Sequence, residues 1–317
     1  MSDFFRKIFG KKNPPTDEVF AAAPTKPLPP VVENEEPPTL PGETAPLSPE
    51  LIQQATQHIN PHQLIVGCGH SVGRQRDHNE DALFTLTTTM VMDSKQVPFG
   101  LYIVADGMGG HQHGEVASGL AIRSIAGYII RKFYLPLYSL RSESASESLQ
   151  EIMQDAVMEG HRSIVKESMN SGTTVTAAVI YSDQLMIAHV GDSRAYSIYP
   201  DGSLKVLTRD HSLVKRLEEL GQITSEEAAL HPQRNVLYRA LGQNEPFEPD
   251  SSSYPLPRGG HLMLCSDGMW GLVSADEISS VIRNTPSPEV ACQMLVNSAN
   301  AAGGPDNITI VIIRIPD

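Results

Sequence analysis

Cysteine is scarce in this sequence. Cys68, Cys265 and Cys292 are the only three among 317 residues, and no Cys-x-x-Cys pair occurs. Three scattered thiols exclude a disulfide framework and a cysteine-based zinc site, and they suit a reducing compartment. No apolar run is long enough to span a bilayer, and the first residues lack the apolar segment and cleavage site of a signal peptide. A cytoplasmic protein without a transmembrane segment is therefore expected.

Basic residues are also in short supply. The chain has 24 Lys and Arg against 37 Asp and Glu, which gives a formal net charge of -13 and a pI near 5.3. This balance argues against a nucleic-acid-binding groove or a broad surface for anionic lipid, since both need extended basic patches. Any ligand that carries phosphate must be attracted locally.

Proline is abundant in one region. Eleven of the 24 prolines fall between Pro14 and Pro49, interleaved with Glu, Thr and Ala. Such a segment buries too little apolar surface to offset its ordering entropy. We expect residues 1–59 to form a disordered Pro-rich extension and residues 60–317 to form the folded domain. The stretch FFRKIFGKK, residues 4–12, favours a short basic amphipathic helix that could contact a membrane surface or a partner; a disordered start is the alternative.

The folded part shows candidate strands and helices. Alternating or fully apolar runs predict strands at 81–90, 100–106, 173–181, 184–191, 194–199, 261–267 and 308–315. Periodic apolar positions predict two long helices, at 114–134 and 146–169. The runs LMLCSD and ITIVII are apolar on both faces, so they need cover on both sides. Two stacked, largely antiparallel sheets with helices outside meet that requirement.

Acidic residues mark the ends of the apolar strands. Each of four strands carries an aspartate at one end, and a fifth acidic pair, Glu80-Asp81, precedes the first strand; the four are Asp106, Asp192, Asp267 and Asp306. Singly, each aspartate reads as a turn former. Together they would lie in one cleft, where crowded carboxylates repel one another unless cations neutralise them. Oxygen ligands of this kind suit Mg²⁺ or Mn²⁺.

Such a cluster has a chemical use. Two divalent ions about 3.5 to 4 Å apart can activate a water and clamp the oxygens of an in-line displacement at phosphorus. That chemistry also needs a cation with fork geometry for the phosphate, which Arg76 could supply. It needs a proton donor for the leaving oxygen as well. His111 and His113 both qualify by position.

Eight stretches in order resemble the metal-dependent protein serine/threonine phosphatases of the PP2C type, closest to the bacterial members. They are RDHNEDA, VADGMGGHQHGEVAS, SGTTVTAAVI, AHVGDSRAYSI, LTRDHSLV, HPQRNVLYRALG, LCSDGMWGLV and GGPDNITIVII. The resemblance covers about residues 64 to 315. It implies an α+β fold, an α-β-β-α sandwich with a dinuclear Mn²⁺ or Mg²⁺ centre in a channel at one edge of the two sheets.

The resemblance also implies roles for the metal-binding residues. Asp106 would bridge the two ions, and the Gly107 carbonyl would help to bind one of them. Asp267 and Asp306 would ligate the other ion. Asp192 corresponds to the aspartate that, together with Asp267, holds a third and weaker ion in bacterial members.

Further roles follow from the same motifs. Glu80 and Asp81 would hold metal-bound waters, and Arg76 would grip the substrate phosphate. The spacing DGMGGH points to His111, rather than His113, as the general acid. Residues 212–240 correspond to the mobile flap that influences substrate access, and we call them the flap. His78 and Ser171 depart from the usual asparagine and methionine without removing a ligand.

Taken together, the residues predict a protein phosphatase that hydrolyses phosphoserine and phosphothreonine by direct attack of a metal-activated water and reverses Ser/Thr kinase signalling. We expect phosphorylated proteins as substrates, a Ser/Thr kinase as a functional partner, and a monomer that binds no nucleic acid. Two alternatives stay open. One is a non-catalytic module that binds a phosphoprotein, which the complete ligand set disfavours. The other is a phosphatase for small phosphate esters.

Overall fold

A computed structural model of the chain describes residues 63–92, 95–109, 114–138, 147–167, 171–243 and 248–317. The predicted Pro-rich extension and basic helix therefore lie outside the described residues, as do His111 and His113. Within the described part, no helix is both long enough and apolar enough to cross a membrane.

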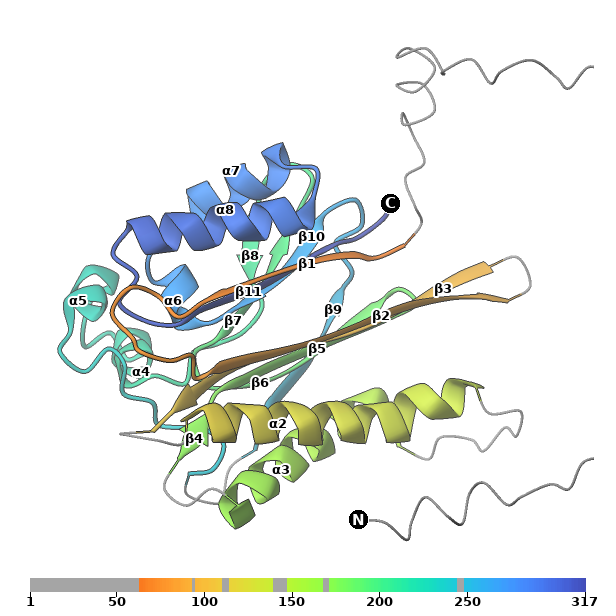
Figure 1. Cartoon of the computed structure of the whole chain (residues 1–317), viewed down its shortest axis with the longest axis horizontal. Coiled ribbons are helices and arrows are strands. Elements are labelled where there is room, and N and C mark those ends of the chain that lie inside the picture. The colour runs from red at the N-terminus through yellow and green to blue at the C-terminus, as the bar shows by residue number, and fades with distance from the viewer. Residues whose placement is uncertain (1–62, 93–94, 110–113, 139–146, 168–170, 244–247) are drawn as a thin grey trace, which may run out of the picture. The chain divides into compact units, whose positions relative to one another are not determined.

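Two antiparallel sheets form the centre of the domain (Figure 1). The first has the strand order β1-β11-β10-β7-β8, with bounds Ile65–Ser71, Ile308–Arg314, His261–Cys265, Arg194–Ile198 and Leu204–Val206. The second has the order β2-β3-β5-β6-β9, with bounds Asp81–Met92, Lys95–Met108, Val175–Tyr181, Gln184–Val190 and Asp250–Pro255. A short strand, β4 (Gly172–Thr173), pairs with the end of β3.

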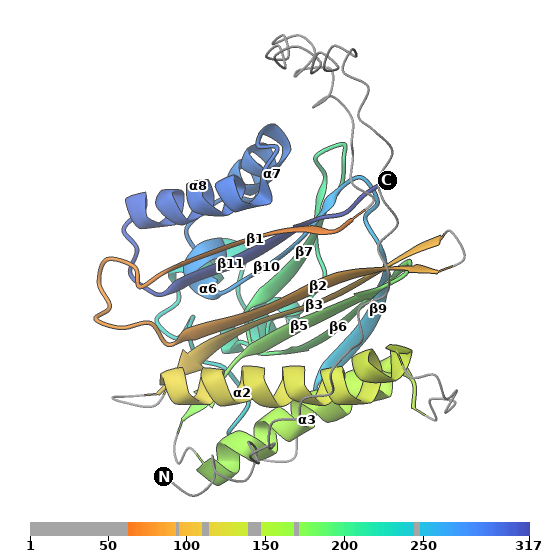
Figure 2. The ribbon, with the colours of Figure 1, turned by 45° about the vertical axis from the view of Figure 1, so that its right-hand side comes forward.

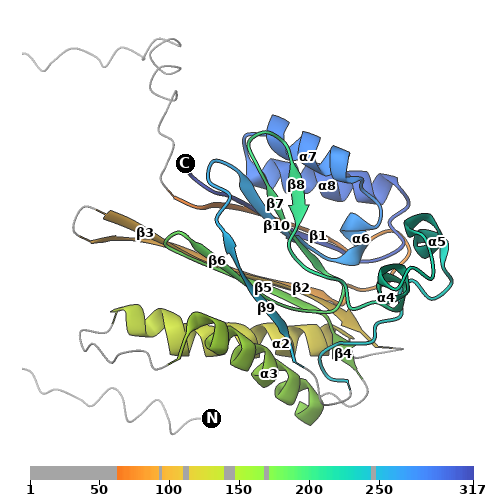
Figure 3. The same cartoon turned by 180° about the vertical axis from the view of Figure 1, so that it is seen from behind.

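Helices cover the outer face of each sheet. Figure 2 shows α2 (Gly114–Ile129) and α3 (Leu149–Glu167) along the second sheet, and α7 (Ala275–Asn284) and α8 (Pro288–Ala301) along the first. Three short helices, α4 (Leu213–Glu219), α5 (Ser225–Leu230) and α6 (Asp267–Trp270), gather at one end of the two sheets (Figure 3). The predicted α-β-β-α sandwich is confirmed.

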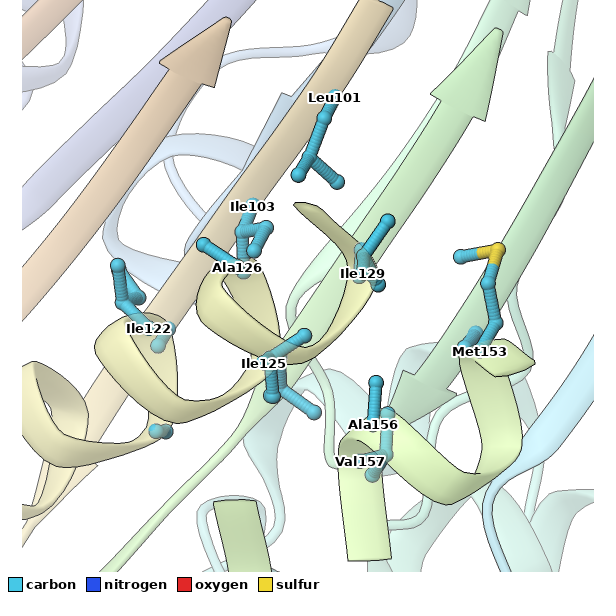
Figure 4. Packing of buried hydrophobic residues seen from close by; sticks show 14 of the residues in the cluster. Leu101, Ile103, Ile122, Ile125, Ala126, Ile129, Met153, Ala156 and Val157 are labelled. Carbon is cyan, nitrogen blue, oxygen red and sulfur yellow. The ribbon is translucent and has the colours of Figure 1, made fainter. Parts of the chain in front are cut away.

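The strands are apolar on both faces because each sheet packs on both sides. In β3, Leu101 and Ile103 pack with α2 and α3, as Figure 4 shows, whereas Tyr102 and Val104 face the other sheet. Strand β11 divides in the same way: Ile310 packs with α7 and α8, while Val311 and Ile313 pack between the sheets. Alternating side chains of a strand point to opposite faces, so a strand in the middle of four layers has no polar face.

The structure adds elements to those predicted. Strands β1, β8 and β9 and helices α4 to α8 had no predicted counterpart. The predicted helix at 114–134 is present, but its last turn, Ile130–Tyr134, is a π-helix followed by a 3₁₀ turn at Leu135–Tyr138. Pro136 lies in this turn and has no N–H to continue the α-helical hydrogen bonding.

Candidate active site

Strand pairing brings the carboxylates of both sheets to one edge. In the second sheet, Asp81 lies directly opposite Asp106 in the β2–β3 register. In the first sheet, Asp267 follows β10 and Asp306 precedes its neighbour β11. The two groups lie close enough together that Asp267 and Asp306 of the first sheet raise the pKa of Asp106 in the second. These four aspartates, which we call the carboxylate edge, lie at the end of the sandwich where α6 begins.

Burial and mutual repulsion raise the pKa values of these aspartates. Burial is the main cause for Asp81, whose pKa rises to about 7, and for Asp267, whose pKa rises to about 6. The pKa of Asp106 lies well above its usual value, because the side chain is buried and faces Asp81, Asp267, Asp192 and Asp306. Raised carboxylate pKa values at one point show that negative charge there is poorly compensated by the protein itself.

One oxygen of Asp81 lacks a partner. Its Oδ2 accepts a hydrogen bond of 2.8 Å from Ser266 Oγ, but its Oδ1 is buried and makes no hydrogen bond to any described residue. The Thr309 hydroxyl lies near enough to lower the pKa of Asp81, yet its oxygen also makes no hydrogen bond of good geometry. A buried, unpaired carboxylate oxygen is costly unless a cation or a cation-bound water satisfies it. The donor set therefore fits divalent ions.

Gly107 allows three segments to meet at the carboxylate edge. Its N–H donates to the Glu80 carbonyl oxygen at 3.2 Å, and Ser118 Oγ of α2 donates to the same oxygen at 2.6 Å. A Cβ atom on Gly107 would lie only 2.2 Å from the Gly114 carbonyl oxygen. A side chain at this position would therefore push α2 away from the end of β3.

Arg76 reaches the edge from the loop between β1 and β2. Its Nη2 donates to Asp306 Oδ2 at 2.8 Å, and its Nη1 lies 3.9 Å from Glu80 Oε2. The arginine side chain keeps 46% of its surface exposed, so its guanidinium is available to a ligand. It lines a cavity of about 540 Å³ together with Asp267 and Asp306 and with residues of α4 and α5.

Asp192 faces the same cavity from the turn after β6. Its carbonyl oxygen accepts a hydrogen bond of 3.0 Å from Trp270 Nε1, in α6. Burial, followed by repulsion from Asp267 and Asp210, raises the pKa of Asp192 well above its usual value. Asp192 is thus an additional buried carboxyl group close to the carboxylate edge.

The histidines near the site fall into two groups. His111 and His113 lie outside the described residues, so the assignment of a proton donor stays a prediction. His78 Nε2 lies 3.6 Å from Glu80 Oε1 and 4.0 Å from Glu115 Oε2. Among the described residues, this is the one trio of His, Cys, Asp or Glu side chains with ligand atoms all within 4.8 Å of one another.

Sequence reasoning missed Asn307, which organises the loop that carries Arg76. Its Oδ1 accepts the Glu80 N–H at 2.8 Å, and its Nδ2 donates to the carbonyl oxygens of Val72 and His78, each at 2.9 Å. The residue is 4% exposed. A signal was present in the sequence, because an amide directly before a fully apolar strand has no evident role in the strand itself.

Two stacked antiparallel sheets between helices, with buried carboxylates and an arginine at one edge, are the fold and site expected of a metal-dependent phosphatase. Comparison with known proteins is more specific. The model of the Protein phosphatase 2C family matches residues 66–308. The chain belongs to this family.

Individual relatives agree. A serine/threonine phosphatase stp of Listeria welshimeri is 35% identical over 242 residues, which are 76% of this chain and 92% of the relative. The solved serine/threonine phosphatase PstP/Ppp of Mycobacterium tuberculosis is 32% identical, with a TM-score of 0.66 over 80% of this chain and 100% of that one. A catalytic domain of PstP in complex with two manganese ions is 30% identical, with a TM-score of 0.65 over 80% of this chain and 99% of that one. The chain is accordingly a metal-dependent protein serine/threonine phosphatase, as the motif series predicted.

Proposed function

We propose that this chain hydrolyses phosphoserine and phosphothreonine in proteins at a centre of two Mn²⁺ or Mg²⁺ ions held by Asp106, Gly107, Asp267 and Asp306. The observation that carries the proposal is the convergence of buried aspartates from both sheets with strongly raised pKa values. The two manganese ions of the related PstP structure support the number of ions.

The positions of the ligands suggest which ion or ion-bound water each of them binds. Asp106 stands opposite Asp81 in the strand register, and Asp267 of the other sheet lies close enough to raise its pKa, so Asp106 suits the bridging role between the ions. Asp81 and Glu80 suit waters on those ions, and the unpartnered Oδ1 of Asp81 supports this. Asp192, across the cavity, suits a third and weaker ion shared with Asp267.

When bound, the ions supply an activated water and positive charge for the phosphoryl oxygens. The chain's own part is to position the substrate. Arg76 presents a planar fork to the phosphate, and its hydrogen bond to Asp306 fixes the direction of that fork. We assign the donation of a proton to the leaving serine or threonine oxygen to His111, on the sequence motif alone.

The substrates, the functional partner and the compartment are inferred from the chemistry of the site and of the cysteines. The substrates are phosphorylated proteins, and a Ser/Thr kinase that phosphorylates them is the functional partner. The three cysteines are free thiols, which supports work in the reducing cytoplasm. The protein acts as a monomer, with residues 1–59 as an extension that provides reach or a contact for localisation.

The test is phosphate release from a phosphothreonine peptide by the full chain with Mn²⁺, with Mg²⁺ and with a chelator. Asp267→Asn should lower kcat by about 10³-fold, since it removes ligand charge where the ions must bind. Asp276→Asn in the exposed first turn of α7 is the matched control and should leave turnover unchanged. Activity that survives chelation would refute the proposal. Turnover of p-nitrophenyl phosphate without any phosphopeptide hydrolysis would point to small phosphate esters.

A further inference from the structure

The backbone of the turn that carries Asp192 needs hydrogen-bond partners from other segments of the chain. Gly191 has φ of +109°, a conformation open mainly to glycine, and a Cβ there would lie 2.6 Å from the Thr174 side chain. Asp192 follows directly and is 7% exposed. Neither polar group of Gly191 is paired within a strand ladder, because β6 ends at Val190. Both groups need partners in the surrounding protein.

His211 supplies a partner to each of these groups. Its backbone N–H donates to the Gly191 carbonyl oxygen at 2.7 Å, and the Gly191 N–H donates to His211 Nδ1 at 3.1 Å. An accepting Nδ1 requires the ring proton on Nε2, which lies 3.2 Å from Asp250 Oδ2. His211 is 1% exposed, so water cannot replace the side chain. The neighbouring His189 adds a contact of 3.0 Å from its Nε2 to the Gly191 carbonyl oxygen.

His211 also lies where the two ends of the flap, near residues 212 and 238, meet. Its own carbonyl oxygen accepts the Tyr238 N–H at 3.0 Å, and the Leu213 N–H donates to the Val236 carbonyl oxygen at 2.8 Å. The next residue, Ser212, is the N-cap of α4, the first helix of the flap. A displacement of either end of the flap therefore moves His211, the residue that is hydrogen-bonded to Gly191.

We infer that His211 is a positioning residue that holds Asp192 in place for an ion and couples that carboxylate to the flap. The inference rests on the proposed role of Asp192 as a ligand of a weak ion. The physical basis is the Nδ1 acceptor. Without it the buried Gly191 N–H loses its partner, the turn relaxes, and Asp192 is no longer fixed toward the cavity.

The molecule contains a reporter for this turn. Trp270 is the single tryptophan of the chain, and its Nε1 donates to the Asp192 carbonyl oxygen at 3.0 Å. The Arg194 guanidinium lies 3.4 Å from the centre of the indole ring. Tryptophan fluorescence during a Mn²⁺ titration therefore reports the position of Asp192 without any need for turnover.

The experiment compares two replacements of the same histidine in the full, metal-stripped chain. Asparagine places an acceptor where Nδ1 is, whereas glutamine reaches the position of Nε2. His211→Gln should shift the weaker phase of the Mn²⁺ titration about tenfold to higher concentration, while His211→Asn should stay within about threefold of the original chain. His70→Gln, at an exposed position of β1 outside the flap, is the matched control and should change nothing.

Each result bears on the inference. Equal shifts for His211→Gln and His211→Asn, or no shift for either, would overturn it. Asp192→Asn should abolish the weaker phase. If it titrates like the original chain, the ligand role of Asp192 fails and the inference falls with it. If Asp192→Asn loses the weaker phase but His211→Gln shows it at the original Mn²⁺ concentration, the inference about His211 fails while the ligand role of Asp192 stands.

A second variant covers the case in which His211→Gln does not fold. Asp250→Ala, on β9, removes the acceptor that fixes the Nε2 proton of His211 and also frees Arg239, whose Nη1 donates to Asp250 Oδ1 at 2.7 Å. It should shift the same phase by about threefold, since the imidazole keeps its contact with Gly191 but loses its orientation. An unshifted titration in this folded variant would overturn the inference.

Discussion

The carboxylate edge and the flap are built in opposite ways, although both face the same cavity. At the carboxylate edge, each aspartate belongs to or adjoins a strand that is paired with neighbours far away in the sequence. In the flap, two short helices depend on local caps, and Leu220 and Leu230 are 54% and 84% exposed. The groups for chemistry are thus fixed by long-range pairing, while the wall toward the substrate is held locally and can adjust.

Of the changes that leave the four aspartates in place, loosening the loop that brings Arg76 to the carboxylate edge should have the largest effect. Asn307→Ala removes one buried and two partly buried hydrogen bonds and leaves the Glu80 N–H unpaired. We expect a loss of about 2 to 4 kcal/mol in unfolding free energy and a drop of about 10²-fold in kcat/KM, because Arg76 loses its position. Urea unfolding and peptide turnover measure both.

Asn300→Ala is the control for that variant. Asn300 also holds the start of the loop, with a hydrogen bond of 3.1 Å from its Nδ2 to Ser71 Oγ, but it touches neither Glu80 nor His78. It should reduce turnover by less than about threefold. Equal losses of turnover in the two variants would mean that the loop as a whole, and not Asn307, determines the position of the Arg76 side chain.

The pH dependence of the metal-free protein should be the next largest effect. In the folded chain the pKa values are about 7 for Asp81 and about 6 for Asp267, and an unfolded aspartate has a pKa of about 3.9. Between these values the folded state binds more protons, so the free energy of unfolding falls as pH rises. We expect a loss on the order of 2 kcal/mol between about pH 5 and about pH 8 in chelator.

Urea unfolding at each pH measures this dependence. Mn²⁺ should remove most of it, because bound ions favour the ionised carboxylates. Asp81→Asn should flatten the metal-free curve. A free energy of unfolding that rises with pH in chelator would contradict the assignment of raised pKa values to the carboxylate edge.

Weakening the flap should cost much less. Thr224 and Glu227 form a capping box at the start of α5, and Thr224→Ala removes the bond that its Oγ1 accepts from the Glu227 N–H. We expect about 1 kcal/mol of local stability to be lost and hydrogen exchange in residues 225–230 to accelerate. Turnover of a small ester should hardly change. A global loss as large as that of Asn307→Ala would abolish the contrast between the two regions.

The smallest effect should come from deletion of residues 1–55. Both regions lie in the part of the chain from residue 60 onward, so turnover of a short phosphopeptide should be unchanged. Localisation and turnover of protein substrates should differ if the Pro-rich extension provides reach or docking. If these are unchanged as well, that role for the extension is wrong.

Sequence patterns predicted the layers and the carboxylate edge because both depend on strong periodicities. An aspartate at the end of an apolar strand is visible without knowledge of its neighbours, and four of them indicate a common site. Helix α8 was missed because Val290 and Met294 are 50% and 45% exposed, which blurs the apolar stripe. Strand β9 was missed because DSSSYP is a polar edge strand that pairs on one side only.

The partners of the positioning residues could not be predicted for a different reason. Asn307 and His211 act on backbone groups of loops that lie far away in the sequence or in another element. Nothing in their local pattern says which carbonyl or N–H they meet. The proton donor remains a prediction for His111, since its segment lies outside the described residues.

The order of strands in the first sheet has a consequence for synthesis on the ribosome. Strand β1 has a single neighbour, β11, and Arg76 is 230 residues from its partner Asp306. At roughly 5 to 20 residues per second, the earliest strand waits on the order of 10 to 50 seconds for the segment that completes both its pairing and the active site. A nascent or prematurely ended chain that lacks Asp306 and β11 should therefore have no phosphatase activity.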